Sequence, residues 1–150
     1  MAGTEPKPRI NVPFFLLGLF HFLISLLALV VVAASFFLPG KSSSPEYTEM
    51  AVVFAVSVAH ALVLVSFWRA WRWKIPLTLV VDVLMIVFFT YTVTAFGKQA
   101  SSSPQEFLQV FQAGVWAYQG ALVLLLFGWV IEWFRGRGEQ GKEETVQVGK

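Results

Sequence analysis

Cysteine is absent from this 150-residue chain. Its absence excludes disulfide-braced folds, thiolate metal sites and cysteine nucleophiles. Charged residues are also scarce, at 13% of the chain, where an ordinary soluble domain has about 25%. The formal net charge of +2 is too small to indicate a nucleic-acid partner. Neither a G-x-S-x-G nor an H-E-x-x-H motif occurs, so we predict no catalytic residues and regard an enzyme as the less favoured class.

Apolar residues are abundant, at 57% of the chain, and they gather in four long runs. A transmembrane helix needs about 20 apolar residues, and only helices satisfy their backbone polar groups one segment at a time. The runs predict helices at about 13–38, 48–70, 75–97 and 105–133. The first run is longer than the apolar region of a signal peptide, so we expect it to be retained. The predicted fold class is an all-α integral membrane protein, a four-transmembrane-helix bundle.

Lysine and arginine are distributed unevenly between the two sides of this predicted bundle. Two lie in the N-terminal segment, three in the 68–74 connection and four in the C-terminal tail, whereas the other two connections hold one each. The positive-inside rule therefore predicts that both termini are cytoplasmic. The expected domains are a cytoplasmic lead at 1–12, a transmembrane domain at 13–134 and a disordered, glycine-rich cytoplasmic tail at 135–150.

Tryptophan and basic residues are concentrated at two places on the predicted cytoplasmic side. Amphipathic rings and long cationic side chains both suit a membrane–water boundary. We predict that these residues anchor the bundle at that interface: Trp68, Arg69, Trp71, Arg72, Trp73, Lys74, Trp129, Trp133 and Arg135.

Three ionisable residues, His21, His60 and Asp82, lie within the apolar runs, away from the ends of the predicted helices. A helix rises 1.5 Å per residue, so each lies about 10–15 Å from the cytoplasmic end of its own helix. An acid in an apolar run is costly and needs a partner or a purpose. We favour an Asp–His hydrogen bond that fixes helix register. A proton-linked or ligand-binding site is the alternative, and the single, scattered positions predict neither a metal site nor a cofactor.

Small residues recur every four positions on the second and fourth predicted helices. Such stripes let helix backbones approach closely, either inside this bundle, which we favour, or between copies of the chain. The fourth helix also carries Gln109, Gln112, Trp116 and Gln119 at spacings of three and four. The stripes consist of Ala51, Ala55 and Ala59 on one helix and Ala113, Ala117 and Ala121 on the other.

The architecture resembles the MARVEL-type tetraspan proteins, especially the small fungal ones, over about residues 10–134. The closest local similarity is in the third predicted helix, where LTLVVDVLMIVFFTYTVTAFG follows a segment of aromatic and basic residues. Asp82 is the one residue of this chain to which the resemblance assigns a counterpart in the family. The resemblance implies a non-enzymatic protein that organises membrane domains, vesicle traffic or a membrane protein assembly through helix–helix and lipid contacts. Many related tetraspans have cysteines in their outer loops and this chain does not, so a disulfide-braced outer domain is not expected.

The alternative function is a small intramembrane ligand-binding protein or isomerase-like enzyme with a polar site around Asp82, His21 and His60. A cavity lined by these residues and Trp116 would favour that alternative, whereas a closed Asp–His contact would favour the organiser. The predicted partners are the lipid bilayer, a second copy of the chain or another membrane protein, and a lipid or sterol. The predicted location is multi-pass in a membrane, with plasma membrane and endomembranes both open.

Overall fold

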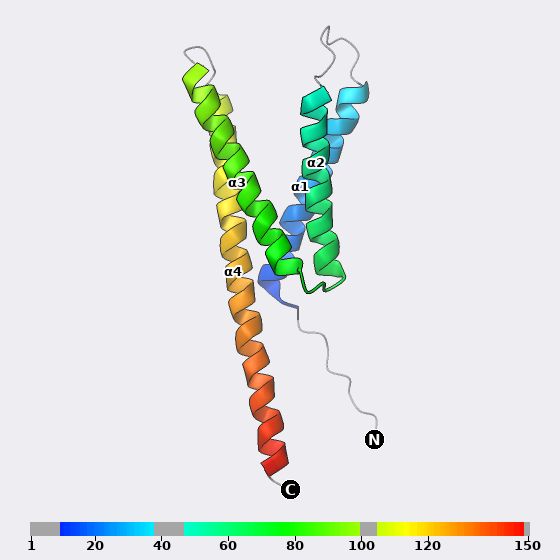
Figure 1. The fold of residues 1–150 in the computed structure, drawn as a ribbon, viewed down its shortest axis with the longest axis vertical. Helices are drawn as coiled ribbons and strands as arrows, with labels where there is room; N and C mark the ends of the chain where they lie inside the picture. Colours follow the sequence, from blue (N-terminus) through cyan, green and yellow to red (C-terminus); the bar gives the residue numbers. More distant parts are fainter. Residues whose placement is uncertain (1–9, 38–46, 100–104, 149–150) are drawn as a thin grey trace.

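The computed structural model of the chain describes residues 10–37, 47–99 and 105–148, and these form four helices (Figure 1). The helices are α1 (Val12–Phe37), α2 (Tyr47–Trp68), α3 (Lys74–Gln99) and α4 (Gln105–Val148). Most of the predicted N-terminal lead at 1–12 lies outside the described residues. Pro13 and Pro76 fall in the first turns of α1 and α3, where a missing backbone N–H costs no intrahelical hydrogen bond.

All four helices are long and apolar enough to span a membrane. Within these candidate spans only 17–22% of the residues are buried inside the protein. Large apolar side chains cover the outer surface, among them Phe15 at 61% and Leu84 at 61% exposure. Lipid is the solvent that such a surface requires. The chain is therefore an all-α, multi-pass integral membrane protein.

The helices form two pairs that meet side by side. α1 packs along α2, α3 packs along α4, and the pairs touch through smaller α1–α4 and α2–α3 contacts. The pairs diverge away from the end of the bundle that carries the α2–α3 turn (Figure 1). In the described part of the chain, α1 with α3 and α2 with α4 have no close backbone contact. These two combinations are the diagonals of the bundle.

The α2–α3 turn begins with a Schellman motif. The N–H of Trp71 donates to the carbonyl of Ser66 at 2.9 Å, and that of Ala70 donates to the carbonyl of Phe67 at 3.2 Å. Ala70 has a φ of 50°, the left-handed conformation that this motif usually gives to glycine. This motif ends α2 at Trp68, two residues before the sequence-based estimate of 70.

Two glycines of α4 admit aromatic rings from neighbouring helices. A Cβ at Gly128 would lie 2.8 Å from the ring of Phe14, and one at Gly114 would lie 3.2 Å from the ring of Phe89. Phe14 belongs to a core cluster with Leu17 and Leu125 that joins α1 to α4. Glycine thus sets how closely α1 and α3 approach α4.

The C-terminal end of α4 differs from the disordered tail expected at 135–150. The helix continues to Val148 and has 44 residues, about 66 Å of length. A helix already nucleated inside the bundle extends without paying the nucleation cost again. Glutamate, glutamine and lysine in residues 139–144 are also good helix formers.

Candidate functional site: two crossed polar bridges

Each helix buries one side chain of an ionisable type in the middle of the bundle: His21 of α1, His60 of α2, Asp82 of α3 and Tyr118 of α4. His21, His60 and Asp82 have no exposed surface, and Tyr118 is only 2% exposed. The two imidazole rings lie side by side, with centroids 5.1 Å apart. We call these four residues the polar cluster.

The periodicity of each helix places these side chains inside. On α1 the buried positions Leu17, His21, Ser25 and Ala28 recur every three or four residues, which puts them on one face. Three of them, His21, Ser25 and Ala28, are the polar or small members of this face.

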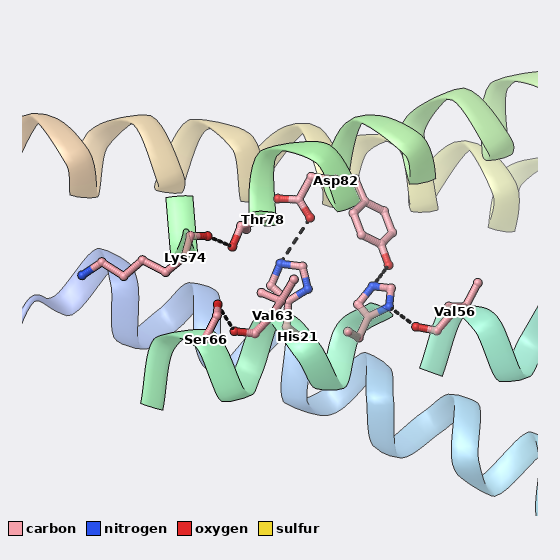
Figure 2. Close-up of polar contacts among 9 residues, drawn as sticks. His21, Val56, Val63, Ser66, Lys74, Thr78 and Asp82 are labelled. Atoms are coloured by element: carbon pink, nitrogen blue, oxygen red, sulfur yellow. Dashed lines mark hydrogen bonds and ion pairs between the residues drawn. The ribbon is translucent and has the colours of Figure 1, made fainter. Parts of the chain in front are cut away.

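The first bridge crosses the α1–α3 diagonal. His21 Nε2 lies 3.2 Å from Asp82 Oδ1, within ion-pair distance but without hydrogen-bond alignment (Figure 2). The other polar atoms, His21 Nδ1 and Asp82 Oδ2, are buried and have no hydrogen-bond partner among the described residues. The sequence predicts an Asp–His hydrogen bond, whereas the two side chains meet at ion-pair distance and none of their four polar atoms has a hydrogen-bond partner among the described residues.

The second bridge crosses the α2–α4 diagonal. His60 Nδ1 lies 2.6 Å from the carbonyl oxygen of Val56, and His60 Nε2 lies 2.7 Å from the hydroxyl of Tyr118. A carbonyl only accepts, so Nδ1 carries a proton and donates it. In the neutral ring Nε2 then accepts from Tyr118. Both nitrogens of His60 are satisfied.

Three hydroxyl groups near the cluster bond to their own helices, whereas Ser25 of α1 donates to the carbonyl of Ser57 of α2 at 3.5 Å. Thr78 donates to the carbonyl of Lys74 at 2.7 Å, and Ser57 donates to the carbonyl of Val53 at 2.9 Å. Ser66 likewise donates to the carbonyl of Val63 at 2.7 Å (Figure 2). These bonds satisfy buried hydroxyls within one helix. Thr78 and Ser57 therefore share faces with Asp82 and His60 but donate to neither.

Tyr118 is the member that sequence reasoning missed. Trp116, a lining residue of the cavity that would favour the ligand-binding alternative, is 67% exposed and lies outside the cluster. The signal available was the stripe Gly114, Tyr118, Ala121, Leu125 and Gly128, whose spacings of three and four mark the inner face of α4.

The alanine stripes run around their helices instead of lying wholly inside the bundle. Ala51 and Ala55 of α2 are exposed and Ala59 is half-buried, whereas on α4 Ala113 and Ala117 are exposed and only Ala121 is buried. The predicted interface residues at 68–74 and 129–135 are all exposed except the half-buried Lys74, and their anchoring role stays a prediction. Lys74 Nζ pairs with Glu132 Oε1 at 3.1 Å, which joins these two segments.

Two grooves open on the surface near the α2–α3 turn, away from the polar cluster. One, of about 480 Å³, runs between α1 and α2, with Lys74 and Glu132 at its polar end and Gly18 among its lining residues. The other, of about 450 Å³, is lined by Trp71 and Trp73 of the α2–α3 turn and by apolar side chains of α2 and α3 such as Leu77. In the described part of the chain no three His, Asp or Glu side chains form a group that could hold a metal ion.

Comparison with known proteins adds no relative: no family model, no curated protein and no solved structure matches this chain. The class defined by the fold is a multi-pass membrane protein with four candidate transmembrane helices. The resemblance to MARVEL-type proteins is not confirmed and stays a hypothesis.

Proposed function

We propose that this chain is a non-enzymatic four-span protein that organises membrane components through its helix faces and lipid contacts, with both termini cytoplasmic. The single observation that carries the proposal is the closure of the polar cluster. His21, His60 and Asp82 have no exposed surface, and the two bridges join helices that have no close backbone contact. A site that turns over a substrate must be reachable by that substrate. A structural cross-tie, by which we mean a polar contact that holds two diagonal helices together, is instead shielded from solvent.

The charge distribution supports the cytoplasmic orientation. Nine of the eleven lysines and arginines lie in the N-terminal segment, the segment 68–74 and the segment from residue 135 onward. Because the chain has no cysteine, single cysteines introduced at Ser43, Ser102 or Gln140 report topology without background. An impermeant maleimide added to intact cells should label Ser43→Cys and Ser102→Cys but not Gln140→Cys. The reverse labelling pattern would overturn the orientation.

The groove between α1 and α2 supports a lipid contact. Its apolar walls end at Lys74 and Glu132, which carry opposite charges at the same level as the exposed Trp68. A Cβ at Gly18 would meet nothing within 4 Å, so Gly18→Leu should fill the groove without a clash. We expect this variant to retain fewer lipids in intact-mass measurements than Ala61→Leu, which adds similar bulk at an exposed position of α2.

Asp82→Asn tests the proposed role in cells. A structural cross-tie predicts that the variant loses folding or trafficking, measured as surface or organelle delivery and resistance to detergent extraction. The matched control is Thr92→Val, which removes a hydroxyl that bonds only to its own helix and should be delivered normally. Normal delivery of Asp82→Asn with loss of a bound small molecule would contradict the proposal.

The second candidate function, a small intramembrane ligand-binding protein, rests on a specific observation. Asp82 Oδ2 and His21 Nδ1 are buried polar atoms without a partner in the described chain, and such atoms are costly. Purification in mild detergent followed by intact-mass measurement separates the two functions. A stoichiometric small molecule released by Asp82→Asn would favour the ligand binder, and copurified membrane proteins without such a molecule would favour the organiser.

A further inference from the structure

The outer face of α4 carries an amide that nothing in the described chain covers. Gln119 is exposed, and its side chain makes no hydrogen bond to another described residue. It lies 11 residues beyond Leu108, where the candidate span begins, which is about 17 Å into a hydrocarbon layer of about 30 Å. Gln119 is therefore near the middle of the membrane.

A bare amide at that depth is unfavourable. Moving an amide out of water without a new hydrogen bond is costly, and polar side chains inside membranes almost always face a protein interior or a water-filled cavity. Tyr118, the preceding residue, occupies the interior of this chain. Gln119 thus requires a partner from outside the described part of this chain.

The exposed residues around Gln119 form a regular stripe. Starting from Gln109, exposed residues recur at alternating spacings of three and four, the 3.5-residue period of a left-handed helix pair. We call this stripe the α4 seam: Gln109, Gln112, Trp116, Gln119, Val123, Leu126, Val130 and Trp133.

Small residues flank the amides of the seam. Ala113 and Gly120, which directly follow Gln112 and Gln119, are both exposed. A Cβ at Gly120 would meet nothing within 4 Å, so this chain's own packing does not require glycine there. A small residue beside a polar one is what allows a second helix to approach closely in a membrane.

We propose that the α4 seam binds the α4 seam of a second copy of this chain in a parallel, two-fold dimer. All copies insert with the same orientation, so paired seams bring identical residues to identical depth. A primary amide is both donor and acceptor, and Gln119 can therefore bond to Gln119 of the second copy, with Gln112 and Gln109 forming further layers. This inference goes beyond the proposed function, because it uses neither the polar cluster nor the groove.

Gln119→Leu tests the central layer. The substitution makes the span more apolar, so folding of the single chain should be unaffected. We expect mass measurement of intact complexes in mild detergent to show dimers for the native chain. For Gln119→Leu the dimer dissociation constant should rise by about tenfold or more. Gln119→Asn, which keeps the amide, and Leu84→Ala, at an exposed position of α3, should both dimerise.

Disulfide cross-linking locates the interface. The cysteine-free chain allows single cysteines at Trp116, Val123, Leu126 and Val130 on the seam and at Leu84 and Phe54 as exposed controls. In native membranes, oxidation should cross-link the seam positions and spare the controls. A monomer in both assays, or cross-linking that is strongest at Phe54 on α2, would overturn the proposal.

Discussion

The two polar bridges differ in how completely they are satisfied. In the α2–α4 bridge, His60 uses both ring nitrogens, one on Val56 and one on Tyr118. In the α1–α3 bridge, His21 and Asp82 meet at 3.2 Å, and each keeps an unpartnered buried atom. The neutral ring of His60 has one donor and one acceptor, and both are used. The carboxylate of Asp82 can accept more hydrogen bonds than one imidazole can donate. The difference makes Asp82 the most consequential polar residue of the bundle.

The largest loss of stability should come from breaking the α1–α3 bridge, whose polar atoms are less completely satisfied. Asp82→Leu removes the carboxylate and leaves the buried imidazole of His21 without its partner. Removing one member of a buried pair costs about 3–5 kcal/mol. Titration with a denaturing detergent, followed by tryptophan fluorescence, measures the free energy of unfolding. A loss below about 1 kcal/mol would mean that His21 finds another partner and that the bridge is dispensable.

Breaking the α2–α4 bridge should lower the free energy of unfolding by less than breaking the α1–α3 bridge. Tyr118→Phe keeps the ring, which contacts Phe20 and Phe89, and removes only the hydroxyl that bonds to His60. The expected cost is about 1–2 kcal/mol, since membrane hydrogen bonds are individually modest. The same titration measures it. If Tyr118→Phe proved more damaging than Asp82→Leu, the ranking of the two bridges would be reversed.

A smaller effect is expected where α1 approaches α4 near the bridges. Gly128→Ala places a methyl group 2.8 Å from the ring of Phe14, so either this ring or α1 itself must shift. The expected loss is about 1 kcal/mol. Gly136→Ala is the control, because a Cβ there meets nothing within 4 Å, and it should be neutral or slightly stabilising. Equal stability of the two variants would show that the α1–α4 spacing is adjustable.

The smallest change in stability is expected for a substitution in the turn between α2 and α3. Ala70 has a φ of 50°, which glycine adopts more easily, so Ala70→Gly should stabilise the protein by about 0.5 kcal/mol. Ala61→Gly, inside α2, should destabilise it by about 0.5–1 kcal/mol. Thermal unfolding in detergent compares the two. Destabilisation by both substitutions would indicate that the turn is not held in this conformation.

Much of this architecture was predictable from the sequence because lipid imposes simple rules. Four apolar runs indicated four helices, and the rarity of ionisable residues in such runs singled out His21, His60 and Asp82. Tyr118 was not predicted, since a tyrosine in an apolar helix is unremarkable until its hydroxyl is seen to face a histidine. The diagonal pairing also required the structure, because helix order around a bundle depends on packing such as Phe14 against Gly128. The continuation of α4 to Val148 was missed because glycine-rich, polar composition alone favours disorder.

A double-mutant cycle of His21→Leu, Asp82→Leu and the double variant measures whether the α1–α3 bridge holds the bundle together. The measured quantity is the free energy of unfolding in detergent. Because an apolar pair replaces a buried polar pair at little cost, the double variant should be more stable than Asp82→Leu alone, with a coupling of about 1–3 kcal/mol. Strictly additive losses would contradict the account, since they would mean that His21 and Asp82 act independently.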